Sequence, residues 1–271
     1  MGIESYGGIG KPDEKTTIGV TNPLCNIVTA FREWSAEADQ HRNLLILLEE
    51  AVTFLRQSQL RSHQKAISHL IDNEFPFTHK YMGIFYTALL NTELVKYVTI
   101  TQPGLDNVWY GFQLEKGILE VKAPDSNVFG DYGNSAKGGC IINRKRTHVM
   151  VGWHAEGGLF INLGAGYLGA AAEAGTFINY GTSYGCTACH SKPTALYIDY
   201  LSRQHRWEIY RGHGLETEWF AHSHKAKKNV LIVNDTSLTL LCKKLKEATA
   251  TENSIELVKR IEERCKQYEP Y

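Results

Sequence analysis

A six-residue stretch, GGCIIN at residues 138–143, recurs as GGLFIN at 157–162 and as AGTFIN at 174–179. The copies are 19 and 17 residues apart, and each combines a glycine, a short apolar run and a final asparagine. Weaker copies stand on either side, at 116–121 and at 194–199. A repeat of this length indicates an architecture in which one structural unit stacks on the next.

A second glycine precedes each of the three clear copies at a constant distance. These glycines are Gly133, Gly152 and Gly169, each six residues before the strand-opening Gly139, Gly158 and Gly175. A strand of four or five residues cannot bury a face alone, whereas stacked strands share a core and pair their backbones along the stack. The chain must turn sharply in every rung, and glycine supplies the positive φ of such corners. The repeat therefore predicts a right-handed β-solenoid of about five rungs.

The repeat also predicts which side chains share a column. One column would be an aliphatic ladder of Ile142, Ile161, Ile178 and Ile198. A polar column at the strand ends would contain Asn143, Asn162, Asn179 and Asp199. Amide and carboxylate groups stacked in this way can form hydrogen bonds along the axis of the solenoid.

The flanks of the repeat have a helical pattern, so the expected fold class is α+β. Three- and four-residue steps relate Leu44, Leu47, Leu48, Ala51, Val52 and Leu55, and a similar pattern reaches Leu70 and Ile71. The chain divides into a flexible lead-in at 1–22, a helical region at 23–104, the solenoid at 105–206 and a helical C-terminal segment at 207–271. Solenoid ends expose unpaired strand edges, so the helical regions are expected to cap them.

At this point the chain resembles a known family. The unit of glycine, five residues, glycine and apolar strand is similar to the glycine-repeat β-helix at the C-terminus of the glutamate synthase large subunit. It is also similar to the glycine-repeat subunit of formylmethanofuran dehydrogenase. The resemblance is best over 151–181 and covers about a third of the chain. Asn143 departs from it, because Arg144 and Lys145 follow where the other copies lead to a glycine. The resemblance implies a non-catalytic domain that packs against partner proteins, and it carries over no catalytic residue.

Residues 164–169, GAGYLG, match the glycine fingerprint of dinucleotide-binding domains. That fingerprint works when a helix follows, because the amides and dipole at the helix N-terminus hold the pyrophosphate. Here the next strand of the repeat already begins near Thr176, which leaves no room for a helix. We therefore interpret these glycines as part of the repeat.

The segment CTACH at 186–190 fits the c-type haem attachment pattern, but a zinc site is the better functional interpretation. Two thiolates at this spacing can bind one tetrahedral metal ion. The proposed ligands are Cys186, Cys189, His222 and His224, with His190 and His205 as weaker candidates. The alternative is a pair of reduced cysteines in a corner of the fifth rung.

Composition narrows the function classes. The 271 residues include 29 basic and 29 acidic residues, so the formal charge is zero and no sequence-wide basic excess points to nucleic acid. No apolar stretch approaches the length of a membrane span, and the N-terminus lacks the features of a signal peptide. We therefore expect a cytoplasmic protein without a membrane partner, in which the six cysteines are reduced thiols or metal ligands.

Three functions stay open at this stage. The first is a non-catalytic scaffold or assembly subunit that binds a protein partner or forms a homo-oligomer. The second is a zinc-binding module, and no other cofactor is expected. The third is an enzyme whose site lies between the solenoid and the helices and uses Arg211, His213 or the pair His222 and His224. No nucleophile elbow, Walker loop or metalloprotease motif supports a particular reaction.

Overall fold

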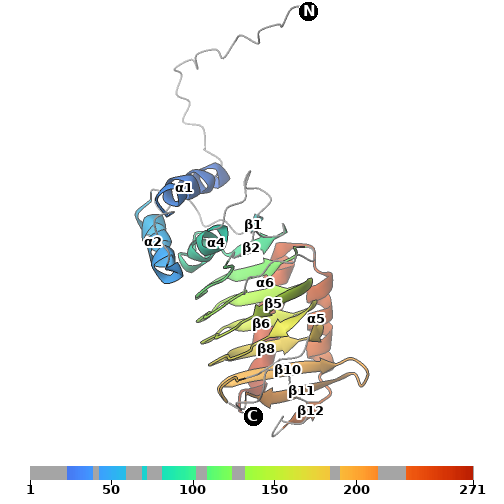
Figure 1. The fold of residues 1–271 in the computed structure, drawn as a ribbon. Helices are drawn as coiled ribbons and strands as arrows, with labels where there is room; N and C mark the ends of the chain where they lie inside the picture. The colour runs from blue at the N-terminus through green and yellow to red at the C-terminus, as the bar shows by residue number, and fades with distance from the viewer. Residues whose placement is uncertain are drawn as a thin grey trace, which may run out of the picture.

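The computed structural model of the protein describes residues 23–38, 43–58, 69–71, 81–101, 109–123, 132–183, 190–212 and 230–270. Strands stacked one above another form the body of the molecule, as Figure 1 shows. Three helices, α1, α2 and α4, lie at the N-terminal end of the stack, and α5 and α6 run along its side. The lead-in at 1–22 lies outside the described residues.

The body of the protein is a β-solenoid of about four turns. Its main sheet has nine strands, and the five copies of the repeat form five consecutive parallel strands of that sheet. These strands are β3 (Ile118–Val121), β4 (Cys140–Asn143), β6 (Leu159–Asn162), β8 (Gly175–Asn179) and β10 (Ala195–Leu201). A second sheet, on another side of the turns, consists of the parallel strands β5 (Arg146–Val151), β7 (Ala165–Leu168) and β9 (Thr182–Ser183).

The main sheet continues beyond the repeat at both ends. At one end β2 (Tyr97–Ile100) pairs in parallel with β3, and β1 (Leu70–Ile71) pairs in parallel with β2. Leu70 and Ile71 thus belong to a strand, although their spacing indicated a helix. At the other end the chain reverses, so that β11 (Arg206–Arg211) and β12 (Leu231–Val233) continue the sheet as antiparallel strands.

The helices pack their apolar faces against the solenoid and against one another. Leu47, Leu48, Ala51 and Leu55 of α2 (Leu44–Gln57) are buried, as their spacing predicted. At the same end of the stack lie α1 (Pro23–Ala38) and α4 (Met82–Asn91). The C-terminal segment forms α5 (Thr236–Glu247), α6 (Thr251–Cys265) and the short 3₁₀ helix η3 (Lys266–Tyr268).

The predicted isoleucine column exists, but it faces the helices and not the interior of the solenoid. Ile142, Ile161 and Ile178 are in register and fully buried, and they pack in one cluster with Leu238 of α5 and Ile261 of α6. Successive side chains of a strand point to opposite faces, so the neighbouring column must face inward. That inner column contains Leu119, Ile141, Phe160, Phe177 and Tyr197.

The last three side chains of the inner column, Phe160, Phe177 and Tyr197, form a stack of aromatic rings that faces the corner glycines. The ring centroids of Phe160 and Phe177 are 4.7 Å apart, and those of Phe177 and Tyr197 are 4.9 Å apart. Gly152, with φ of 76°, lies so close that a Cβ atom would be 2.6 Å from Phe177 Cε1. Gly169, with φ of 66°, would place a Cβ atom 2.7 Å from Tyr197 Cε1. Glycine at these corners therefore serves both the backbone turn and the space for the rings.

The predicted polar column forms a hydrogen-bonded ladder. Asn143 Nδ2 donates to Asn162 Oδ1 at 2.8 Å, and Asn162 Nδ2 donates to Asn179 Oδ1 at 2.8 Å. All three side chains are buried. Asp199, in the same register, accepts a hydrogen bond of 2.6 Å from the hydroxyl of Tyr210. The side-chain amides of Asn143 and Asn162 thus each find a partner in the next rung, which ties these rungs together in one register.

Candidate functional site

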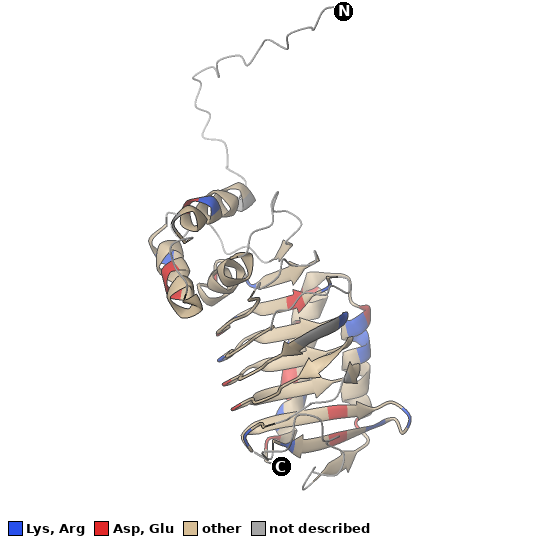
Figure 2. Ribbon diagram, in the orientation of Figure 1, with Lys and Arg blue, Asp and Glu red and all other residues tan. Residues whose placement is uncertain are grey.

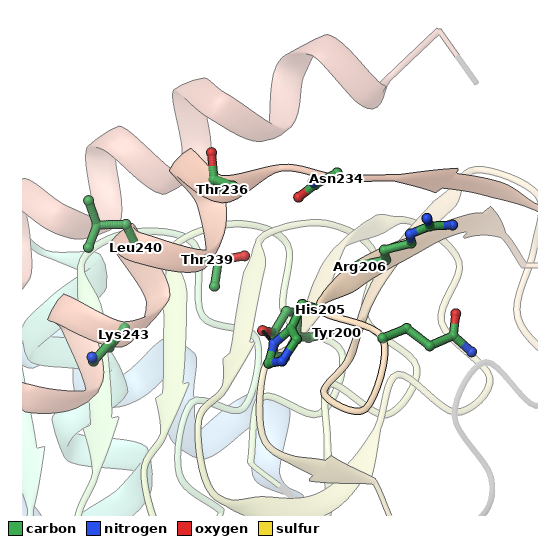
Figure 3. Close-up of a pocket in the computed structure, with 9 residues that line it drawn as sticks. Tyr200, His205, Arg206, Asn234, Thr236, Thr239, Leu240 and Lys243 are labelled. Atoms are coloured by element: carbon green, nitrogen blue, oxygen red, sulfur yellow. Dashed lines mark hydrogen bonds between the residues drawn. The ribbon is translucent and has the colours of Figure 1, made fainter.

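The candidate site is a groove of about 550 Å³ between the β10–β11 hairpin and helix α5 (Figure 3). Its lining residues come from two segments more than 25 residues apart in sequence and include polar, aromatic and basic side chains. They are Tyr200, Gln204, His205, Arg206, Asn234, Thr236, Thr239, Leu240 and Lys243. We call this site the hairpin–helix groove.

One wall of the groove is the tip of the hairpin. The backbone amide of Gln204 donates to the backbone carbonyl of Leu201 at 3.0 Å, and this hydrogen bond closes the turn. His205 follows with φ of 53°, a left-handed conformation that histidine adopts more readily than most side chains do. Its Nδ1 lies 3.2 Å from the hydroxyl of Tyr200. The turn therefore presents an imidazole and a phenol together at the edge of the groove.

A buried tryptophan connects the hairpin to the helix beneath the groove. Trp207 Nε1 donates to Thr239 Oγ1 at 3.0 Å and lies 3.2 Å from the carbonyl oxygen of Asp235. The Trp207 ring also packs on Tyr200, with the ring centroids 4.9 Å apart. Because Trp207 is fully buried, these contacts hold the two walls in a fixed relation.

The start of α5 is held by Asp235, which caps the helix. Its carboxylate accepts hydrogen bonds from the amide of Leu238 at 2.9 Å, from Arg264 Nε at 2.8 Å and from the Tyr268 hydroxyl at 2.6 Å. Burial acts to raise the pKa of Asp235, but these hydrogen bonds outweigh burial and hold the pKa below its ordinary value. Asp235, which stands between the lining residues Asn234 and Thr236 in sequence, is thus already bound by protein donors.

The hairpin–helix groove has a basic lining. His205, Arg206 and Lys243 line it and are exposed, and no carboxylate is among the lining side chains. In the part of the chain that the structure describes, no carboxylate forms an ion pair with Arg206 or Lys243. Leu240, 51% exposed, adds an apolar surface. The site can therefore accept an anionic group, hydrogen-bond a polar backbone and contact an apolar side chain.

A second polar cluster lies between the sheet and the C-terminal helices, where it has a structural role. Glu120 is 1% exposed and binds Arg144, Lys122 at 2.9 Å and the hydroxyl of Thr99 at 3.2 Å. Arg144 also donates to the carbonyl oxygens of Leu245 and Lys246 at the end of α5. Arg144 therefore anchors α5 to the solenoid.

Three buried thiols lie beside the isoleucine column. Cys140, Cys242 and Cys265 all belong to the apolar cluster between the main sheet and helices α5 and α6. Burial raises the pKa of Cys140 and of Cys242, and it raises the pKa of Cys265 to about 12. These side chains therefore stay protonated at neutral pH and pack as small apolar groups.

The predicted zinc ligands Cys186, Cys189, His222 and His224 all lie outside the described residues, as does His213. Across the described ranges, no group of three or more His, Cys, Asp or Glu side chains could hold a metal ion. The two weaker candidates differ in their surroundings: His190 occupies a rung corner with φ of 57°, whereas His205 belongs to the groove.

Arg211, a candidate for the enzyme hypothesis, binds backbone oxygens. Its guanidinium donates to the carbonyls of Thr194, at 3.3 Å, and Glu269. The glycines of the dinucleotide fingerprint surround strand β7, and no helix follows them before β8. The structure thus supports the interpretation that these glycines belong to the repeat.

Sequence reasoning missed the hairpin–helix groove, although it named His205 as a weak metal ligand. The only local signals are the basic residues Arg203 and Arg206 around His205 and the lysines of α5.

No helix among the described residues is long and apolar enough to cross a membrane. Comparison with protein-family models, curated protein sequences and solved structures found no match to this chain.

Proposed function

We propose that the protein is a non-catalytic scaffold or assembly subunit of the cytoplasm that binds a partner protein. The observation that carries this proposal is the hairpin–helix groove, in which basic, aromatic and apolar side chains are exposed on rigid walls. Binding sites on such preorganised walls lose little conformational entropy when a partner docks. The resemblance to glycine-repeat domains that pack against partner proteins supports the same function.

The polar groups buried in the solenoid favour a structural role over catalysis there. The asparagine ladder, the pair of Glu120 and Arg144 and the cap at Asp235 all direct their hydrogen bonds to other parts of the fold. Such groups hold the rungs and helices in register. The zinc site at Cys186 and Cys189 stays a separate proposal, which elemental analysis tests.

Cross-linking in the source cell tests the scaffold proposal. A lysine-reactive cross-linker should connect Lys243 and the adjacent Lys244 to one identified protein, recovered in a constant ratio to this chain. Lys96 and Lys259, both exposed and outside the groove lining, provide the control positions. The proposal is wrong if Lys243 and Lys244 form cross-links only within the chain while the chain purifies as a monomer.

A further inference from the structure

We propose that the hairpin–helix groove recognises an acidic peptide segment of the partner, one that combines carboxylates with an apolar side chain. This inference rests on the proposed scaffold function and specifies the chemistry of its partner. The carboxylates would bind Arg206 on the hairpin and Lys243 on α5, and the apolar side chain would contact Leu240. Figure 3 shows Arg206 on the hairpin side and Leu240 and Lys243 on the side of α5.

The charge of the groove identifies the partner as anionic. Elsewhere on the surface, Lys116 pairs with Glu93 at 3.1 Å and Lys192 pairs with Glu173 at 3.0 Å. Among the described residues no such partner stands beside Arg206 or Lys243. Figure 2 shows further basic residues at the hairpin tip and along α5. Cations that line one recess without an ion-pair partner among the described residues favour a ligand that brings its own negative charge.

Asp235 and Asp199, two acidic residues of the segments that form the groove, are bound within the fold. Asp235 accepts hydrogen bonds from Arg264, Tyr268 and the backbone amide of Leu238, so donors within the fold already bind its negatively charged carboxylate. Asp199, at the start of the same hairpin, binds the Tyr210 hydroxyl at 2.6 Å. Both carboxylates are therefore held by internal donors, and neither is among the residues that line the groove.

The apolar part of the lining favours a peptide over a small inorganic anion. Leu240 is 51% exposed at the groove, and the ring of Tyr200 lies against Trp207 on the other wall. The side chains of Gln204 and Asn234 offer amide donors and acceptors that suit a peptide backbone. A phosphate ion would use the cations alone, whereas an acidic segment with a leucine or similar side chain uses all three kinds of contact.

The size of the basic surface and the balance of charge argue against nucleic acid. The chain has a formal net charge of zero, whereas nucleic-acid binders carry an extended basic face that follows many phosphates. A recess of about 550 Å³ fits a few side chains of a peptide. Fixed walls then select the segment by its sequence of charge and apolar side chains.

Fluorescence anisotropy with two labelled peptides tests the inference on the full chain. The first is an eleven-residue peptide in which glutamates alternate with leucines and serines, and the second has glutamine at every glutamate. We expect the acidic peptide to bind and the neutral peptide to bind at least about tenfold more weakly. Binding of the acidic peptide should also weaken as salt is added, because its charges are exposed to solvent.

Charge-reversal variants locate the binding. Arg206→Glu combined with Lys243→Glu should weaken the acidic peptide at least about tenfold, because both reversed charges repel the carboxylates. The control combines Lys96→Glu with Lys259→Glu, which makes the same change in net charge away from the groove and should leave binding unchanged. The milder pair Arg206→Gln and Lys243→Gln repeats the test if the reversed variant melts at a lower temperature than the parent.

Several outcomes would overturn the inference. Equal affinity for the two peptides, or equal loss in the groove and control variants, would show that the groove does not select acidic segments. If millimolar inorganic phosphate competes fully with the acidic peptide, the groove is a simple anion site. If light scattering shows a dimer of the parent and a monomer of the groove variant, the occupant is a second copy of this chain. If the cross-linked partner persists while the acidic peptide fails to bind, the scaffold function stands and only this inference fails.

Discussion

Gly169 is the residue at which the solenoid makes its sharpest quantitative prediction. Its φ of 66° is left-handed, and a Cβ atom there would lie 2.7 Å from Tyr197 Cε1 and 2.8 Å from Phe177 Cδ1. The left-handed conformation costs an alanine about 1–2 kcal/mol, and overpacking of a core costs about 1–3 kcal/mol. Gly169→Ala should therefore lower the free energy of unfolding by about 2–5 kcal/mol, and Gly169→Val should prevent folding.

Urea denaturation followed by circular dichroism measures this change. The matched control is Ala171→Gly, two residues further on, where an alanine already has φ of 54°. Relief of that conformation offsets the larger entropy of glycine in the unfolded chain, so the control should change stability by less than about 1 kcal/mol. A Gly169→Val protein that is soluble and melts like the parent would refute the packing of the glycine corners on the aromatic stack.

Three further predictions concern other parts of the fold. Ile161→Ala should lower the free energy of unfolding by about 2–5 kcal/mol in urea titrations, because Ile161 is fully buried. The control Ile232→Ala, at a residue that is 50% exposed, should change the free energy of unfolding by less than about 0.5 kcal/mol. Equal effects of the two variants would mean that the register is wrong. Because folding lowers the pKa of Asp235, its ionised carboxylate stabilises the fold at pH values above the ordinary pKa of an aspartate. This contribution to the free energy of unfolding is lost as the pH falls through the lowered pKa. The difference in melting temperature between the parent and Asp235→Asn should thus shrink below about pH 4, and a constant difference would contradict it. Finally, the zinc-site prediction requires that elemental analysis finds one zinc ion per chain in the parent and none in Cys186→Ser. A parent that contains no metal and melts at the same temperature as Cys186→Ser would contradict this prediction.

The sequence was sufficient for the stacking of the rungs, because the repeat determines register directly. The five copies, the asparagine ladder and the glycine corners all follow from residues at equivalent positions of the repeat. Strand β2 has no such signal, since it lacks the glycine found at the start of β3, β4, β6 and β8. It joins the sheet through tertiary contacts with β3 and α4.

The side of the sheet on which each column lies could not be predicted from the repeat alone. Ile161 and Phe160 are both buried, because helices cover the outer face of a sheet whose inner face is the solenoid core. Because both columns are apolar, the alternation of side chains does not reveal which column faces the solenoid core. The aromatic rings opposite the corner glycines do reveal it, since only glycine leaves room for a ring across the narrow interior.

The groove could not be predicted from the sequence for a different reason. Arg206 and Lys243 are far apart along the chain, and they line one groove because β11 turns antiparallel and Trp207 binds Thr239. No local motif encodes a contact that depends on the packing of a hairpin against a helix. Arg144 is a similar case, since its partners at the end of α5 follow it by about a hundred residues.

The molecular mass of the native complex tests the scaffold proposal most directly. The tagged chain, purified from its source cell, is measured by size-exclusion chromatography with light scattering, alongside the variant with Arg206→Glu and Lys243→Glu. We predict that the parent exceeds its own 30.5 kDa by the mass of one identified protein in constant ratio, and that the variant elutes as a folded 30.5 kDa monomer. A parent that is itself a 30.5 kDa monomer, or a variant that keeps the same partner, would contradict the proposal that this groove binds the partner.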